Sequence, residues 1–238
     1  MGRIAMLVLS TILSGLLVTG LLGLTERFAD STHVSVDTKN RPVRGNTAVQ
    51  TACELRLPAA IPGTSLIAEY MVCYEGPFIE DRSDTPVVDI AALVLRNAGD
   101  QLVTRADVTV ERAGEQYHFS ATYILPGMSV MVLEASGTDY FRDGITTLSG
   151  AEKTEPYLPS VFRALALQHK DLACITVTNL SDREMKNLIL YHKTYLPDGT
   201  LVGGITYKTE IEALPPNGTV TIYPEHYAKD YSQIFYAQ

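Results

Sequence analysis

The chain begins with a long apolar run. From Ile4 to Leu24 no residue is charged, and Leu, Val and Ile predominate. A helix gains about 1.5 Å per residue, so a run of this length can cross a hydrocarbon core of about 30 Å. The pattern predicts a transmembrane helix over residues 4–24, within an N-terminal membrane anchor that covers residues 1–29.

A cleaved secretory signal is the alternative for the same run. Such signals have an apolar core of roughly 7 to 15 residues that ends at small residues. The run here is longer, and cleavage after Ala29 would place Arg27 where a small residue is usual. We therefore favour an anchor, with secretion after cleavage as the alternative.

Charges beside the run set its expected orientation. Arg3 and the amino terminus precede it, whereas Glu26, Arg27 and Asp30 follow it. Because positive charge is retained on the cytoplasmic side, we expect a single-pass protein of the cell membrane with a cytoplasmic N-terminus. The C-terminal domains are then extracytoplasmic.

After the anchor the pattern changes twice. Residues 30–49 are polar and have no hydrophobic period, which is typical of a stalk. From residue 50 onward, β-branched and aromatic residues alternate with polar ones in short segments that Gly, Pro, Asn and Asp separate. A period of two predicts strands, so we expect the exported part to be all-β.

The alternating segments repeat. Residues 89–100 align with residues 171–182, and Asp, Ala, Asn and Asp recur in register, with Ala91 and Ala173 both expected to face inward. Each copy continues through further strands to a Leu-Pro turn with a glycine. The repeat predicts two tandem immunoglobulin-like β-sandwich domains, residues 50–137 and 161–238, joined by a linker at residues 138–160.

The second copy also resembles known modules. Its features between Cys174 and Tyr223 are Asn179-Leu-Ser-Asp, Leu190-Tyr191, Tyr195-Leu-Pro-Asp-Gly, Gly203-Gly204 and Leu214-Pro. This stretch resembles the FxLYD-type and related fibronectin-like or CARDB-like β-sandwich modules of bacterial surface proteins, although Phe-x-Leu-Tyr-Asp itself is absent. The resemblance implies an extracytoplasmic adhesion, spacing or interaction module, and these modules share no active site.

Composition and motifs argue against several classes of function. The formal net charge is −8, and the clustered Lys and Arg that bind phosphate backbones are missing, so we expect no nucleic-acid binding. His118, His169 and His192 lie in strand-like segments beside no nucleophile motif, and there is no glycine-rich phosphate loop. We expect no enzymatic activity and no cofactor.

Residues 75–89 form a segment that only the first repeat contains, and we expect a loop there. It combines apolar with acidic residues, as a partner-contact surface can. Its carboxylates suit hard cations, but their spacing matches no calcium loop, so we expect no metal site. The expected partner-contact residues are Phe78, Ile79, Glu80, Asp81, Arg82 and Asp84.

Three cysteines lie in the part that is expected to be exported, where disulfides are permitted. Cys53 and Cys73 lie in neighbouring strand-like segments, which makes them a candidate disulfide. Cys174 takes the place of Ala92 in the repeat, and we expect it to be a partly covered structural thiol.

These features favour a membrane-anchored extracytoplasmic scaffold or protein-interaction protein without catalytic activity. Its expected partners are the membrane, through residues 4–24, and an envelope protein. The alternative is a module that binds cell-envelope polysaccharide. That function would require Tyr195 and Tyr207 to be exposed and coplanar.

Overall fold

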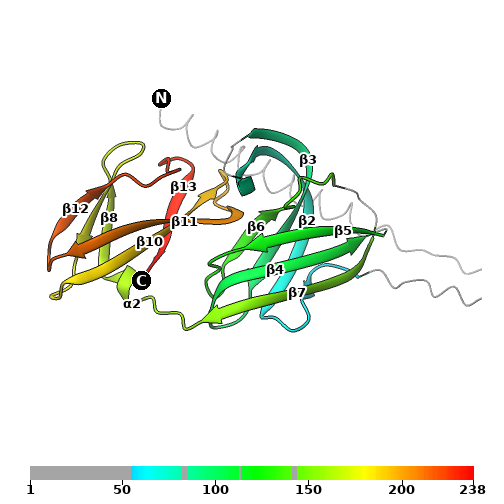
Figure 1. Ribbon diagram of the computed structural model, residues 1–238, viewed down its shortest axis with the longest axis horizontal. Coiled ribbons are helices and arrows are strands. Elements are labelled where there is room, and N and C mark those ends of the chain that lie inside the picture. Colours follow the sequence, from blue (N-terminus) through cyan, green and yellow to red (C-terminus); the bar gives the residue numbers. More distant parts are fainter. Residues whose placement is uncertain (1–54, 82–84, 113, 141–143) are drawn as a thin grey trace, which may run out of the picture. The chain divides into compact units, whose positions relative to one another are not determined.

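The structure is a computed structural model that describes residues 55–81, 85–112, 114–140 and 144–238 (Figure 1). The expected anchor, the stalk and Cys53 lie outside these ranges, so the membrane helix and its orientation stay predictions. Within the described ranges, no helix is long and apolar enough to cross a bilayer.

Nearly every described element is a strand, which confirms the all-β prediction. The elements, in chain order, are β1 (Ala59–Ala60), β2 (Leu66–Phe78), η1 (Ile79–Asp81), β3 (Thr85–Asn97), β4 (Leu102–Arg112), β5 (Glu115–Ala121), β6 (Ser129–Leu133), β7 (Ile145–Glu155), α2 (Ser160–Arg163), β8 (Leu165–His169), β9 (Ile175–Asn179), β10 (Met185–Tyr195), β11 (Leu201–Leu214), β12 (Thr219–Ile222) and β13 (Ser232–Ala237).

The strands fall into two sets that pair in the same way. In the first strand set, β1–β7, the pairing orders are β2-β3-β6 and β5-β4-β7. In the second strand set, β8–β13, they are β8-β9-β12 and β11-β10-β13. Adding six to each label of the first set gives the second, so the sequence repeat is also a repeat of strand pairing.

A buried asparagine ends the second strand of the first repeat. The Asn97 side-chain amide donates to the carbonyls of Gln101, at 2.8 Å, and Ile124, at 2.9 Å. Its side-chain oxygen accepts from the backbone N–H of Gly99 at 2.9 Å. Asn97 therefore closes the turn to β4 and ties it to the segment before β6.

Asn179 does the same in the second repeat. Its amide donates to the carbonyls of Arg183, at 2.7 Å, and Leu214, at 3.1 Å, and its oxygen accepts from Ser181 N–H at 2.9 Å. Both asparagines are fully buried. Because a buried amide must satisfy its hydrogen bonds, the repeated Asn has a packing role that its sequence position alone did not reveal.

Each strand set encloses its own core, to which alternate residues of both sheets contribute. Core residues of the first set include Leu66, Leu93, Val108, Phe119 and Val132. Core residues of the second set include Ile175, Leu188, Ile211, Ile222 and Ile234.

Two local expectations differ from the structure. Residues 145–155, inside the expected linker, form β7, which pairs with β4 from Ile145 to Glu155. Ala173 is exposed, so its inward placement was wrong. The reason is an Asx turn in which Ala173 N–H donates to the Asp171 carboxylate at 3.0 Å, and β9 begins only at Ile175.

We predict that Asn97→Ala and Asn179→Ala each lower the free energy of unfolding by about 2–3 kcal/mol, because each leaves buried backbone groups without a partner. Urea unfolding of the full-length chain measures this. Gln116→Ala, on an exposed position of β5, is the control and should change stability by less than about 0.5 kcal/mol. If only one of the two asparagine variants loses stability, the result would contradict equivalent roles for Asn97 and Asn179.

Candidate functional site

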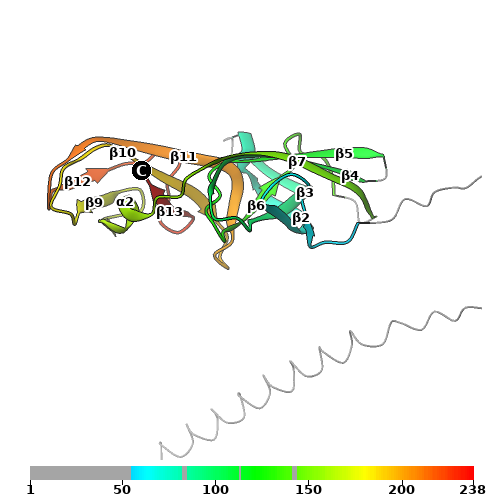
Figure 2. The same ribbon diagram turned by 90° about the horizontal axis from the view of Figure 1, so that it is seen from below.

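The two strand sets share one sheet. Leu201 and Val202, at the start of β11, pair in parallel with Val130 and Met131 of β6. This pairing joins the strands into one sheet of order β1-β2-β3-β6-β11-β10-β13. Figure 2 shows β11 running from the neighbourhood of β12 to that of β6. We call the contact region around the start of β11 the junction.

Two glycines let β11 change its partner. The pairing of β10 with β11 shifts at Lys193, because His192 pairs with Tyr207 and Thr194 pairs with Val202. Residues 203–206 of β11 therefore form a bulge opposite Lys193. Gly203 has a φ of +92°, which favours glycine. A Cβ atom on Gly204 would overlap the carbonyl oxygen of Ser120. The backbone of β11 can therefore approach the end of β5, where Thr122 N–H donates to the Gly204 carbonyl at 2.8 Å.

Two opposite charges hold this bulge. The Glu80 carboxylate, on η1, accepts from the backbone N–H of Gly204 at 2.8 Å. Lys193 is fully buried, and its Nζ donates to the three consecutive carbonyls of residues 203–205, at 2.9 to 3.1 Å. The peptide group between Gly203 and Gly204 thus directs its carbonyl to the ammonium and its N–H to the carboxylate. Its dipole is aligned between the two charges.

Burial acts against both charges. It lowers the pKa of Lys193 to about 7, and the negative charge of Glu80 partly offsets this. It also raises the pKa of Glu80, although hydrogen bonds from the N–H groups of Gly204 and Leu133 oppose the shift. A buried charge is tolerated only when hydrogen bonds and an opposite charge compensate it. Here backbone groups supply most of that compensation.

A tyrosine cluster adds an apolar contact between the strand sets. The ring of Tyr123 lies 4.3 Å from that of Tyr191, measured between centroids, and Tyr191 lies 5.6 Å from Tyr236. Tyr157, on the connecting segment, lies 5.7 Å from Tyr236. Leu102 of β4 is buried in the same cluster. Aromatic pairs at these distances stabilise a contact beyond the area they bury.

The expected contact loop is mostly a hairpin. β2 extends to Phe78 and β3 begins at Thr85. Ile79 is buried against Gly203, and Glu80 binds the bulge, so both of these expected contact residues have partners within the chain. Phe78 is half-buried. The other expected contact residues are not described: Arg82, Asp84 and the side chain of Asp81 lie outside the described parts of the chain.

Histidine and tyrosine rings stack beside the junction. Tyr207 stacks on His192, with 5.1 Å between centroids, and on His226, with 4.9 Å. Tyr227 meets His192 edge-on at 5.3 Å and stacks on His169 at 5.9 Å. Burial lowers the pKa of His192 to about 4, so its imidazole is neutral at pH 7. These rings pack on one another and leave His192 little access to a substrate.

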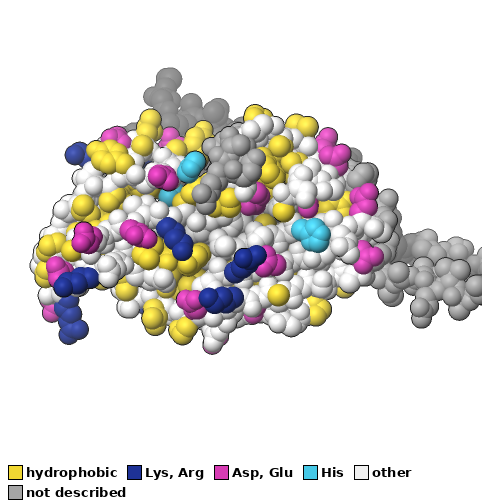
Figure 3. Space-filling model, in the orientation of Figure 1, with side chains coloured by type: hydrophobic (Ala, Val, Ile, Leu, Met, Phe, Trp, Pro, Cys, Tyr) yellow, Lys and Arg dark blue, Asp and Glu magenta, His cyan; other side chains and the backbone are white. Residues whose placement is uncertain are grey.

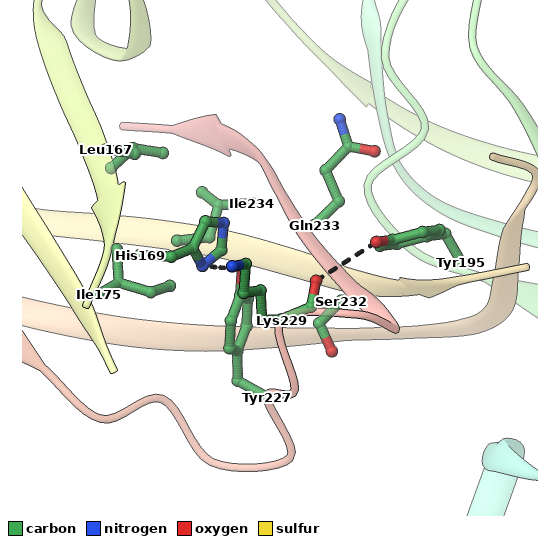
Figure 4. A pocket seen from close by; sticks show the side chains of 9 residues that line it. All are labelled: Leu167, His169, Ile175, Tyr195, Tyr227, Lys229, Ser232, Gln233 and Ile234. Carbon is green, nitrogen blue, oxygen red and sulfur yellow. Dashed lines mark hydrogen bonds between the residues drawn. The ribbon is translucent and has the colours of Figure 1, made fainter. Parts of the chain in front are cut away.

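Two hollows adjoin the stack. A groove of about 330 Å³ is lined by Ile79 from the first strand set and by Tyr207, His226 and Tyr231 from the second. A cavity of about 250 Å³ lies wholly in the second set (Figure 4). There Tyr227 and His169 point toward each other, with Oη and Nδ1 3.4 Å apart.

The two tyrosines proposed for a sugar platform serve other contacts. Tyr195 is half-buried, and its hydroxyl donates to the Lys229 carbonyl at 3.3 Å (Figure 4). Tyr207 is also half-buried and has two histidine rings against it. A glycan platform needs a free ring face, so this geometry favours packing for both residues.

The cysteines have different surroundings. Cys174 is a free thiol that is fully buried, and not partly covered as expected. Cys73 is exposed, with its sulfur 3.3 Å from an Asp89 carboxylate oxygen. Because Cys53 lies outside the described residues, the disulfide stays a prediction. No group of three His, Cys, Asp or Glu side chains that could hold a metal occurs in the part of the chain that the structure describes.

Sequence reasoning missed Lys193. It follows Leu188, Leu190 and His192 on an alternating strand, and a lysine there is ordinarily a solvated residue. The one available signal was the Gly203-Gly204 pair inside a strand, which indicates close approach of another backbone. That pair does not indicate that a charge lies beneath it.

A scan against protein-family models and a search of curated proteins find no match to this chain. Its function must therefore be inferred from the fold and the junction themselves.

We predict that Lys193 makes stability depend on pH. Its folded pKa of about 7 lies below its ordinary value of 10.5. Between these pH values the unfolded chain binds a proton that the folded chain does not, so the free energy of unfolding should rise with pH. Each tenfold difference in proton affinity between the two states contributes roughly 1.4 kcal/mol to the rise. Urea unfolding of the full-length chain from pH 6 to 10 measures it.

Lys193→Met should abolish this rise. Lys186→Met, which changes an exposed lysine of the same strand, should leave it intact. Equal pH slopes for the wild-type and Lys193→Met chains would mean that Lys193 keeps an ordinary pKa.

We further predict that Gly204→Ala lowers the free energy of unfolding by roughly 3 kcal/mol, because the new methyl group must push β5 and β11 apart. Gly199→Ala is the control. Unlike Gly204, Gly199 has a positive φ, +85°, and it has open space around it, so the alanine there should cost only about 1 kcal/mol of backbone strain. Equal losses in urea unfolding would show that the β5–β11 contact is not tight.

Proposed function

We propose that this chain is a membrane-anchored extracytoplasmic scaffold or protein-interaction protein without catalytic activity. In this proposal residues 4–24 span the membrane, residues 30–49 form a stalk, and two tandem immunoglobulin-like sandwiches present the binding surface. The observation that carries the proposal is the junction. It joins the two repeated strand sets through one shared sheet, and together they would present the binding surface.

The chemistry of the described polar groups supports a binding role. All three donors of the Lys193 ammonium are used by backbone carbonyls, and the His192 ring is packed between tyrosines. Groups held in this way stabilise a fold and have no position left for a substrate. On the face in Figure 3, acidic and basic side chains are interspersed with apolar ones.

The hairpin of β2 and β3 remains our proposed partner contact. Ile79 and Glu80 are engaged in the junction, so the contact would use outward residues such as Val88, whose side chain is exposed. Polysaccharide binding is the second candidate function. It is supported by Tyr223 and Tyr231, which are the more exposed tyrosines of the second strand set.

We predict that in-cell crosslinking of the full-length protein, followed by affinity capture, recovers an envelope protein in near-equal amount. Val88→Asp should abolish this capture, since it places a charge on the hairpin. Leu180→Asp, at an exposed apolar residue of the second strand set, should not. Capture of wall glycan without any protein would contradict the scaffold function and support the polysaccharide module.

The proposed orientation is tested by adding protease to intact cells. The protease should cleave the C-terminal part of the chain, because the proposal places that part outside the membrane.

A further inference from the structure

In each strand set, two strands at equivalent places in the pairing order lie at one side, and they belong to different sheets. We call the side between these two strands the seam. The seam lies between β2 and β7 in the first set and between β8 and β13 in the second. The four strands have equivalent places in the repeated pairing order. The two seams can therefore be compared position by position.

In the first set the segment before β2, which includes β1, lies in the seam. Leu55 N–H donates to the Ile145 carbonyl of β7 at 2.8 Å, and Ala59 pairs with Ala68 of β2. Ile61 is buried against Gly150 of β7. The segment of residues 55–61 thus contacts both strands, and Leu57 and Ala59 pack on the core. We call it the seam strand.

The buried asparagines fix the equivalent positions in the second set. Leu66 lies opposite Asn97 in the β2–β3 pair, and Leu165 lies opposite Asn179 in the β8–β9 pair. Two residues further along, Ala68 therefore corresponds to Leu167. Ala68 has the seam strand on its outer side. β8 is the edge of its sheet, and no described strand pairs with Leu167 on that side.

Only part of the second seam is covered. The short helix α2 precedes β8 as the seam strand precedes β2, and its Val161 and Phe162 pack on the core. Beyond α2 lies the 250 Å³ cavity, lined by Leu167 and His169 of β8 and by Ser232 and Ile234 of β13 (Figure 4). A hollow of about 280 Å³ also lies beside Leu55 and Leu57 at the first seam. The two seams therefore differ in strand pairing: β1 pairs with the outer edge of β2, whereas β8 has no described strand on its outer edge.

The far wall of this cavity is fixed. It is formed by the segment between β12 and β13, where Lys229 N–H donates to the Leu172 carbonyl at 2.8 Å. Tyr195 N–H also donates to the Tyr231 carbonyl at 2.8 Å. Because these bonds hold the wall in place, an incoming segment would meet a preformed site and lose little free energy in ordering it.

We propose that the seam between β8 and β13 binds an extended peptide strand of a partner protein. The peptide would pair its backbone with the outer edge of β8 and place apolar side chains, at alternate positions, in the cavity. Strand addition to a free sheet edge uses main-chain hydrogen bonds for affinity and pockets for specificity. The seam strand of the first set shows which chemistry such a seam accepts. This site is separate from the hairpin contact proposed above.

The test selects displayed peptides on the purified full-length chain. The pool is an eight-residue library with Ala, Val, Leu or Ile at alternate positions and polar residues between them. The seven-residue seam-strand sequence, residues 55–61, is displayed separately beside it. Selected peptides are then titrated by fluorescence anisotropy. Hydrogen exchange with and without the peptide locates the site on the wild-type chain.

The proposal expects peptides that slow exchange in residues 165–169 and 232–236. Leu167→Lys should weaken their binding at least tenfold, whereas Leu180→Lys, at an exposed leucine in the turn after β9, should not. The exchange map uses the wild-type chain, so it decides the matter even if Leu167→Lys fails to fold. No selected peptide, or protection confined to β2 and β7 or to the hairpin, would overturn the proposal.

Discussion

One peptide group determines how this protein is assembled. The Gly203–Gly204 peptide lies between a buried ammonium and a buried carboxylate, with its carbonyl toward Lys193 and its N–H toward Glu80. Each charge would be costly in an apolar interior without the other and without the backbone groups between them. Glu80 belongs to the first strand set and Lys193 to the second, so the two sets must meet before the two opposite charges can offset each other. The bulge of β11, its parallel pairing with β6 and the end of the β2–β3 hairpin meet at this arrangement.

The junction affects which surfaces the two repeated strand sets can present to a partner. Two domains on a free linker would present independent surfaces, whereas these two strand sets share a sheet and a tyrosine cluster. A shared sheet creates a groove whose walls come from both sets, beside a stack of histidine and tyrosine rings. The seam of the second set is a separate feature: its edge strand β8 is unpaired, whereas the equivalent strand β2 of the first set is paired with β1. The groove thus depends on the contact between the two sets, and the open seam depends on a difference between them.

Much of the fold was predictable from local patterns. Alternating apolar residues identified the strands, and the repeat of residues 89–100 at 171–182 identified the equivalent turns. The β7 strand was missed because its residues mix Gly, Thr and charge, as an edge strand with one exposed face does. The site was less predictable. The composition of residues 75–89 indicates a contact segment, but the contacts that Ile79 and Glu80 make are within the chain. Lys193 was missed because burial of a charge depends on distant residues that no local pattern contains.

Native-state hydrogen exchange of the full-length chain tests the central claim most directly. The relevant amides are Gly204, which donates to Glu80, and Thr122, which donates to the Gly204 carbonyl. If the junction makes one cooperative unit, these amides should open with the same free energy as core amides such as Val108 and Leu190. If both junction amides exchange much faster while the two cores stay protected, the strand sets fold independently and the charges do not hold them together.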